Sequence, residues 1–182
     1  QGVPFYVDER VIVPRSYIGE LMAGEMFAGS DDSLIPDSAA IESVLDLCTG
    51  SGCLAILAAM RFETAEVCAT DLSKEALEVA KINVSKHFPD GRVRLLHGDL
   101  FAPLKGRKFD LIIANPPYVA EAETAAFEAE YRAEPLMAHV SGADGFDLTR
   151  RILTEASAHL TDAGLLICEI GTGADLLAEA FP

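Results

Sequence analysis

The stretch Val44–Gly52, which reads VLDLCTGSG, decides the fold of this chain. Its first part, Val44–Cys48, is a short apolar run followed by turn residues, a pattern typical of a buried strand. Thr49–Gly52 is a glycine-rich turn, and a helix is expected from about Cys53 to Met60. Glycines let the backbone approach a ligand closely, and unpaired N–H groups at a helix start favour a negative group. The stretch therefore predicts a strand, a ligand-binding turn and a helix.

The glycine-rich turn also matches the fingerprint of dinucleotide-binding proteins. Gly50, Gly52 and Ala55 have the expected spacing. Asp71 follows about 20 residues later, where an acid that binds a ribose is expected. Taken alone, this match indicates a nucleotide or nucleoside ligand. The alternative is a tight turn that only packs the helix against the strand.

Apolar runs alternate with helical patterns along the rest of the chain, which is typical of a parallel α/β sheet. Further strands are expected at Val67–Ala69, Val93–His97, Phe109–Ala114 and Leu165–Ile170. Helices are expected after an N-cap at Ser73 as far as Phe88, around Phe146–Leu160, and from near Gly173. The predicted fold class is α/β, with a Rossmann-like, mostly parallel sheet and helices on both faces.

Two regions lie outside this alternation. Residues 1–15 alternate around a polar centre at Asp8–Arg10, which predicts a β-hairpin that links to a missing N-terminal domain. Residues 16–182 are expected to form the ligand-binding domain. Its closing strands are expected to be missing, because the last helix has nothing after it to pack against. The long connection 119–145 is acidic, and long connections after strand ends are often functional. It carries Glu121, Glu123, Glu128, Glu130 and Glu134 against a single Arg132.

Composition narrows the class of protein. With 182 residues, half of them hydrophobic, the chain is expected to be one domain with its own core. No apolar run reaches the length of a membrane span, and we expect no secretory leader. The cysteines, at positions 48, 53, 68 and 168, form no C-x-x-C pair. These features predict a cytoplasmic protein with reduced thiols and no metal site. The net charge of −15 argues against binding a phosphate backbone and favours a small-molecule ligand or a basic protein partner.

Three acidic residues are expected at the sheet edge where α/β proteins bind ligands. Asp46 lies within the first strand, and a buried carboxylate there needs an N–H or ammonium partner. Asp71 ends the second strand, where it can accept two hydrogen bonds from a ribose diol. Asp99 follows the third strand, where it can accept from a purine amino group. The alternative for each acid, strongest for Asp99, is a helix N-cap or a loop residue.

The fourth strand leads into NPPY at 115–118, at the same edge of the sheet. The two prolines fix the backbone and remove two N–H donors, so nearby carbonyls are left to accept from a ligand. Asn115 offers an acceptor and a donor pair on one planar group. Tyr118 offers a flat face for stacking. These residues suit a planar group that bears an NH₂. The alternative, a structural turn, explains the prolines but not the amide and the aromatic beside them.

Together these motifs resemble a known group of enzymes. Asp46–Gly52 followed by NPPY resembles the class I S-adenosylmethionine-dependent methyltransferases that act on planar amino groups. More narrowly, the chain resembles the protein glutamine N-methyltransferases of the HemK/PrmB group. That resemblance covers nearly the whole chain, including Val11–Arg15, Glu134–Leu136, Gly142–Gly145 and Glu169–Gly171.

The resemblance implies an acceptor site at NPPY. Asn115 and the Pro116 carbonyl would accept hydrogen bonds from the amide NH₂ of the substrate and direct its nitrogen at the methyl group. Tyr118 would complete this catalytic set. No general base is evident in the motif. His97 and His139 are available, but a lone histidine is more often a surface or packing residue.

The resemblance also implies S-adenosylmethionine as the cofactor and S-adenosylhomocysteine as its product. Asp46 would face the methionine ammonium, Asp71 the ribose and Asp99 the adenine amine. Arg15 would contact the cofactor carboxylate or the substrate, unless it is only a surface ion pair. The implied cofactor-binding residues are Arg15, Asp46, Cys48, Thr49, Gly50, Ser51, Gly52, Asp71, Leu72, Asp99, Leu100 and Asn115.

Two features resemble the PrmB branch of this group more than its release-factor branch. Release-factor enzymes typically carry acidic residues soon after the Pro-Arg pair, whereas this chain continues with Ser16-Tyr17-Ile18-Gly19-Glu20. Cys48 replaces their usual glycine. The implied partner is a basic protein, the third protein of the large ribosomal subunit, methylated on a glutamine. That branch has a helical N-terminal domain and two further strands, so the chain resembles the catalytic core of a longer protein.

Three other functions share part of the pattern. An amino-group methyltransferase of adenine or guanine in nucleic acid would share the turn and NPPY, but the net charge of −15 argues against it. A nicotinamide dehydrogenase would leave Asp46 and NPPY without a role. A regulatory module that only binds the cofactor would keep its function after Asn115→Ala.

Overall fold

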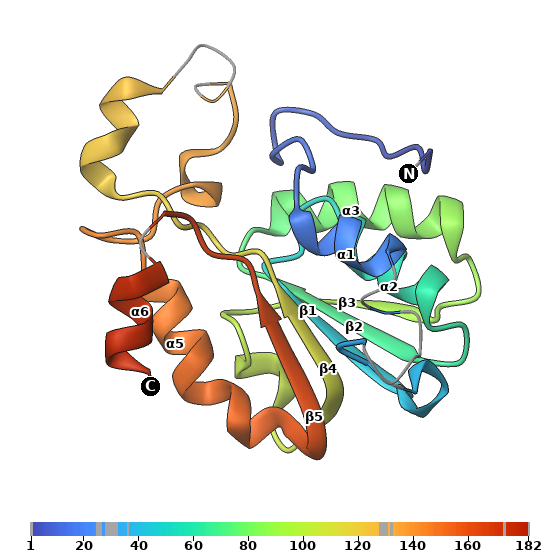
Figure 1. The fold of residues 1–182 in the computed structure, drawn as a ribbon. Helices are drawn as coiled ribbons and strands as arrows, with labels where there is room; N and C mark the ends of the chain where they lie inside the picture. The colour runs from blue at the N-terminus through green and yellow to red at the C-terminus, as the bar shows by residue number, and fades with distance from the viewer. Residues whose placement is uncertain are drawn as a thin grey trace.

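The protein is an α/β domain built on one parallel sheet. The computed structural model describes residues 2–24, 27, 33–35, 37–127, 131, 133–172 and 174–181. Within these ranges, five strands form a sheet in the order β3-β2-β1-β4-β5, and every neighbouring pair is parallel. Figure 1 shows this sheet with α2 and α3 on one side and α5 on the other. The predicted Rossmann-like fold class is confirmed.

The helices supply the long crossovers that parallel strands require. The strands are β1 (Ser43–Leu47), β2 (Glu66–Asp71), β3 (Val93–His97), β4 (Phe109–Ala114) and β5 (Leu160–Cys168). The α-helices are α1 (Tyr17–Ala23), α2 (Cys53–Arg61), α3 (Lys74–His87), α5 (Asp147–Glu155) and α6 (Ala174–Ala180). Short 3₁₀ segments are η2 (Ser38–Ala40), η3 (Ala102–Leu104), η4 (Glu121–Ala126), η5 (Leu136–Ala138) and η6 (Ala156–His159).

Most predicted elements are present, with shifted ends. β3 and β4 span the predicted residues, and Ser73 caps α3 by accepting a hydrogen bond from the Ala76 N–H (3.0 Å). β5 begins at Leu160, where the sequence predicts the end of a helix, because an irregular register lets this residue pair with Phe109. Gly173, the predicted start of the last helix, lies outside the described residues. Helix α1 was not predicted, although Ser16 caps it and its buried residues have helical spacing.

The predicted β-hairpin is wrong for residues 2–15, which contain no strand. A turn is present, closed by a hydrogen bond from the Val11 N–H to the Asp8 carbonyl (3.1 Å). The backbone on either side of this turn donates to distant side chains instead of pairing as two strands. Tyr6 donates its N–H to the Asn83 side chain (2.7 Å), and Val13 donates to Glu134 (2.9 Å). Residues 2–16 are named the N-terminal strap below. Its link to a further domain stays a prediction.

Both faces of the sheet are covered by apolar packing. In β1, Val44 packs in a cluster with side chains of α1 and α2, whereas Leu45 and Leu47 pack with Ile152 of α5 on the opposite face. This alternation points Asp46 toward α2. A parallel sheet buried on both faces requires near-continuous apolar strands, so a carboxylate in β1 needs a structural explanation.

Asp46 joins the end of β1 to the start of α2. The residue is fully buried, and its Oδ2 accepts hydrogen bonds from Thr49 Oγ1 (2.5 Å) and the Ala55 N–H (3.0 Å). The Ala55 N–H is one of the donors at a helix start that have no partner inside the helix. Asp46 Oδ1 is buried with no hydrogen-bond partner among the described residues. The carboxylate thus binds the glycine-rich turn and the start of α2 from the buried side.

This burial generates a prediction about pH. Burial raises the pKa of Asp46 from 3.8 to about 7, and the hydrogen bonds from Thr49 and Ala55 offset this only in part. Because the folded state holds this proton more tightly than the unfolded state, the free energy of unfolding should fall as pH rises through this range. Asp46→Asn keeps an acceptor for both donors and removes this pH dependence. Denaturant unfolding at several pH values should show that the free energy of unfolding of the variant increases relative to that of the wild type as pH rises.

Asp162→Asn is the matched control, because Asp162 is exposed near the opposite end of the sheet. Its stability difference from the wild type should stay constant over the same pH range. A difference between Asp46→Asn and the wild type that does not change with pH would contradict the prediction.

Candidate functional site

A cleft lies beyond the carboxyl ends of the central strands, where α/β sheets bind ligands. Residues at or just after the ends of four strands line it, namely Cys48, Gly50, Thr70, Asp71, Leu72, Ser73, Gly98, Asp99, Leu100, Asn115 and Pro117. The strap closes another side with Arg10, Val11 and Ile12, and Met137 of η5 also lines it. Much of the predicted cofactor set therefore meets in one place. These residues are Cys48, Gly50, Asp71, Leu72, Asp99, Leu100 and Asn115.

Asp71 ties together two of the turns that border the cleft. Its Oδ2 accepts from the Gly50 N–H (2.8 Å), and its Oδ1 accepts from the Ser73 N–H (2.8 Å). Burial raises the pKa of this carboxyl, and the two backbone donors act in the opposite direction. Gly50 has φ +54°, and a Cβ there would meet no atom within 4 Å. The turn therefore presents open space and bare backbone to a ligand.

Backbone strain is concentrated at this cleft. Among the described residues, Cys48 (φ 57°) and Leu100 (φ 45°) are the non-glycine residues with positive φ, and both line the cleft. Such a conformation costs of order 1–3 kcal/mol and persists only where the surrounding structure enforces it. Cys48 thus occupies a left-handed position, which favours glycine.

Several predicted cofactor residues lie elsewhere. Asp46 is behind the turn, with no surface in the cleft. Thr49 and Ser51 border an adjoining hollow between the turn and the strap, which shares Cys48, Gly50 and Asn115 with the first cleft. Gly52 starts α2, where a Cβ would lie 3.2 Å from Ala80 Cβ, so this glycine permits helix packing. The contact of Asp46 with a ligand ammonium remains a prediction that the geometry does not favour.

Asp99 faces the cleft but already has a cationic partner. Arg151 of α5 donates from Nη1 to Oδ1 (3.1 Å) and from Nη2 to Oδ2 (2.9 Å). Each carboxylate oxygen has a second lone pair, so a further donor can still bind. Both side chains are about half-exposed, so this pair contributes little to stability.

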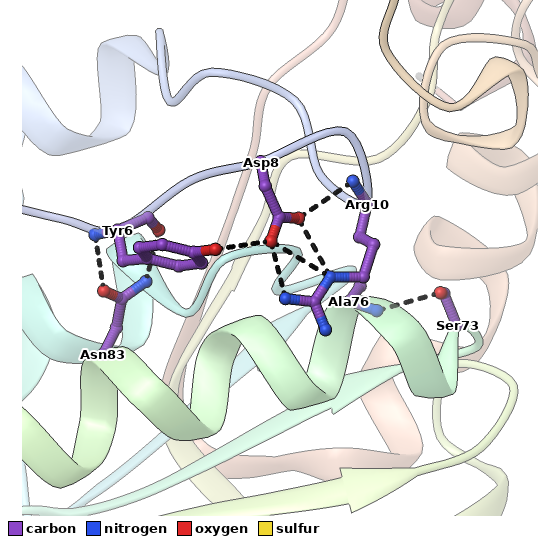
Figure 2. A network of polar contacts seen from close by, with 6 residues as sticks. All are labelled: Tyr6, Asp8, Arg10, Ser73, Ala76 and Asn83. Carbon is purple, nitrogen blue, oxygen red and sulfur yellow. Dashed lines mark hydrogen bonds and ion pairs between the residues drawn. The ribbon is translucent and has the colours of Figure 1, made fainter.

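The strap is held over the cleft by a polar network (Figure 2). Arg10 donates from Nη2 to Asp8 Oδ2 (2.6 Å), and the Tyr6 hydroxyl donates to the same oxygen (2.9 Å). The hydrogen bonds from Arg10 hold the pKa of Asp8 well below its usual range. Asn83 is fully buried and donates to the carbonyls of Tyr6 (2.9 Å) and Ser51 (2.9 Å). One amide thus connects the strap to the glycine-rich turn.

A second cavity opens beside Asn115. It is lined by Ile12, Arg15, Asn115, Pro116, Pro117, Tyr118, Val119, Glu123, Phe127, Tyr131, Ala138 and His139. Asn115 therefore borders this cavity and the first cleft. Within the described residues, neither the Asn115 side chain nor the Pro116 carbonyl has a hydrogen-bond partner. The predicted catalytic residues Asn115, Pro116 and Tyr118 thus line one cavity, and the polar groups of Asn115 and Pro116 are free within the described residues.

Glu134 anchors the wall of the second cavity. Its side chain is 7% exposed and accepts from Arg15 Nη2 at Oε1 (2.8 Å). His139 Nε2 lies 3.0 Å from its Oε2. Arg15 also lies over the ring of Tyr131, 5.0 Å from its centroid. Arg15 lines the second cavity and also the hollow at the glycine-rich turn, so its contact with the substrate or with the cofactor carboxylate stays a prediction.

The predicted acidic segment divides into two parts. Glu121 and Glu123 are exposed on η4, and Glu123 lines the second cavity. Glu134 is buried and engaged as described, so it is not part of a solvated acidic face. Glu128, Glu130 and Arg132 lie outside the described residues.

Sequence reasoning missed three residues that shape the site: Asn83, Glu134 and Glu169. Asn83 sits on the apolar face of a predicted helix, and a polar residue at such a position is the signal that could have identified it. Glu134 and Glu169 were noted only as parts of motifs. In the described part of the chain, no group of three His, Cys, Asp or Glu side chains could hold a metal, and no helix there is long and apolar enough to span a membrane.

Curated relatives share most of this sequence. The chain is 60% identical over 184 residues to the ribosomal protein uL3 glutamine methyltransferase of Bradyrhizobium diazoefficiens, covering 100% of this chain and 57% of the relative. It is 52% identical over 190 residues to the protein of the same name from Burkholderia pseudomallei, covering 99% and 59%. The chain thus spans less than two thirds of the length of these relatives.

Solved structures share the fold at lower identity. The catalytic domain of hMettl16, solved with an RNA hairpin of the MAT2A 3′UTR, has a TM-score of 0.70 at 16% identity, over 98% of this chain and 65% of that one. TrmN from Thermus thermophilus has a TM-score of 0.56 at 26% identity, over 78% of this chain and 36% of that one. Residues 33–131, more than half of the chain, match the model of the methyltransferase small domain, and the protein belongs to that family.

Proposed function

We propose that this chain is the catalytic core of an enzyme that methylates the side-chain amide of a glutamine in ribosomal protein uL3, with S-adenosylmethionine as donor. The observation that carries the proposal is the free Asn115 amide and Pro116 carbonyl at the junction of two cavities. The names of the relatives support glutamine as the acceptor. Action on a ribosomal protein would place the enzyme in the cytoplasm.

The first cleft fits the donor. Asp71 has capacity left to accept from a ribose diol, because its two oxygens offer about four lone-pair sites and the backbone N–H groups of Gly50, Leu72 and Ser73 use at most three of them. The open space at Gly50 admits a ligand against the backbone. Leu72 and Leu100 provide apolar surface for a purine, with Asp99 beside them. The strap borders this cleft with Val11 and Ile12.

The second cavity fits a carboxamide. When bound, the donor supplies a methyl group activated by a sulfonium. The Asn115 oxygen and the Pro116 carbonyl accept the two amide hydrogens, which directs the nitrogen at the first cleft. These acceptors also stabilise positive charge that develops on the nitrogen during transfer. Holding the amide in one orientation lowers the entropic part of the barrier.

The nucleic-acid alternative has less support. The hMettl16 neighbour was solved with RNA, but at 16% identity it shows the fold alone. The cavity beside Asn115 is bordered by Glu123 and by exposed Glu121 nearby, which disfavours a phosphate backbone. Methylation of a uL3 fragment but not of an adenine-containing RNA would decide between the two acceptors.

The donor site is tested by Asp71→Asn. Replacing a charged acceptor weakens its hydrogen bonds by about 1.5–3 kcal/mol, so calorimetry should show S-adenosylmethionine binding at least about tenfold more weakly. Asp162→Asn, with the same charge change far from the cleft, should bind as the wild type does. If the wild type bound NADH and did not bind S-adenosylmethionine, the proposed donor site would be wrong and the dehydrogenase alternative would be favoured.

The acceptor site is tested by Asn115→Ala. Removing one preorganised acceptor should lower kcat about 100-fold while S-adenosylmethionine binding changes little. Methyl transfer to a uL3 fragment and calorimetry provide the two readouts. Full activity in this variant would remove Asn115 from the mechanism and favour a module that only binds the donor.

The acidic rim is tested by changing Glu121 and Glu123 to Gln together. If these carboxylates attract a basic substrate, KM for the uL3 fragment should rise, and its increase with salt should become smaller. The control pair Glu63→Gln and Glu78→Gln makes the same charge change at exposed positions away from the rim. A wild-type KM that does not depend on salt would exclude this electrostatic role.

A further inference from the structure

The segment Glu169–Gly171 lies beside the NPPY motif, although 51 residues separate Tyr118 from Glu169 along the chain (169 − 118). The Glu169 N–H donates to the Ala114 carbonyl (2.8 Å), which extends the β4–β5 pairing by one step. The chain therefore leaves β5 alongside the exit of β4. The proposed function uses the NPPY motif after β4 and assigns no role to Glu169–Gly171 after β5.

Gly171 makes room for the Tyr118 ring. A Cβ at this position would lie 2.8 Å from Cδ2 of Tyr118, closer than real Cβ contacts. Gly145 likewise leaves space for the backbone of Tyr118. It has φ +85°, and a Cβ there would overlap the Tyr118 carbonyl oxygen. Tyr118 is thus enclosed on two sides by glycines from distant motifs, and the bare Cα of Gly171 sets the position of its ring.

Glu169 connects this ring to the start of α1. Its Oε2 accepts from Ser16 Oγ (2.6 Å) and from the Tyr17 N–H (3.0 Å). Burial raises the pKa of the Tyr118 phenol, and the negative charge of the same carboxylate raises it further. One carboxylate therefore links the end of the strap, the end of β5 and the aromatic residue of the acceptor cavity.

We infer that Glu169 and Gly171 are positioning residues for Tyr118, and that they fix its ring as a wall of the acceptor cavity beside Asn115. The inference rests on the proposed function in assigning an acceptor to that cavity. Neither residue lines the cavity, so both act through Tyr118. A misplacement of about 1 Å can lower the rate about 100-fold, because the amide must meet the methyl group in one orientation.

The phenol environment offers a direct readout of this contact. Burial raises the pKa of Tyr118 above its usual 10, and the negative charge of Glu169 raises it further. The other groups that act on the phenol are Tyr131, which also raises its pKa, and Arg15, which lowers it. Glu169→Gln removes the negative charge, so the pKa of Tyr118 should fall.

The first experiment follows tyrosine ionisation by ultraviolet difference absorbance. Subtracting the Tyr118→Phe curve isolates Tyr118 from the other tyrosines. We expect a lower pKa for Tyr118 in Glu169→Gln and an unchanged value in Glu63→Gln, which makes the same charge change at an exposed site. An unchanged Tyr118 pKa in Glu169→Gln would overturn the inference.

The second experiment separates positioning from folding. Gly171→Ala should lower kcat about tenfold or more while its melting temperature and S-adenosylmethionine affinity stay near the wild type. The matched control is Gly24→Ala, where a Cβ makes only ordinary contacts at 3.5 and 3.6 Å. A Gly171→Ala enzyme with unchanged kcat would overturn the inference.

The third experiment is a double-mutant cycle. Glu169→Gln should lower kcat in the wild-type background and have little further effect in Tyr118→Phe, because the two changes remove one interaction. Ser16→Ala disturbs only the α1 end of the network, so its effect should be the same in both backgrounds. An equal effect of Glu169→Gln in both backgrounds would show a structural role alone and overturn the inference.

The two proposals can fail separately. A wild-type protein that methylates no glutamine in uL3 would refute the proposed function, and the titration would still decide whether Glu169 holds the Tyr118 phenol. Conversely, an active enzyme whose Tyr118 ionises independently of Glu169 would refute only the inference.

Discussion

The hydrogen bonds that Asp71 accepts from Gly50 and Ser73 are the interaction on which the rest of the site depends. The strands β1 and β2 each end in a turn, and Gly50 and Ser73 lie in these two turns. Asp71 satisfies one donor from each of two neighbouring turns. The floor of the first cleft is therefore held by one half-buried carboxylate, and its spare lone pairs face the space where a ligand would bind.

Other parts of the protein repeat this arrangement with different side chains. Asp46 supports the glycine-rich turn from behind, Asn83 joins that turn to the strap, and Glu134 joins the strap to the loop after β4. Each of these groups is buried and accepts or donates to backbone. Burying a polar group is costly unless it is hydrogen-bonded, so these positions tolerate few substitutions.

The acceptor side follows the opposite principle. There the polar groups of Asn115 and Pro116 have no partners among the described residues, and the protein instead uses shape to fix what surrounds them. The prolines set the backbone, and Gly145 and Gly171 leave space for Tyr118. Free acceptors in a rigid wall suit a ligand that brings its own donors. The two cavities therefore differ chemically. In the cleft for the methyl donor, Asp71 already accepts hydrogen bonds from the protein, whereas Asn115 and Pro116 in the other cavity have no such partner among the described residues.

The sequence by itself determined the fold class, the glycine-rich turn and the strands β3 and β4, because these depend on local periodicity and turn chemistry. It also placed Asp71, Asn115 and Tyr118 at the sheet edge, since parallel strands end on the same side. Only the tertiary structure decided that residues 2–15 form a strap rather than a hairpin, and that Asp46 lies behind the cleft. Val13 and Glu134 are 121 residues apart, and no local pattern encodes which distant side chain will satisfy a given backbone group.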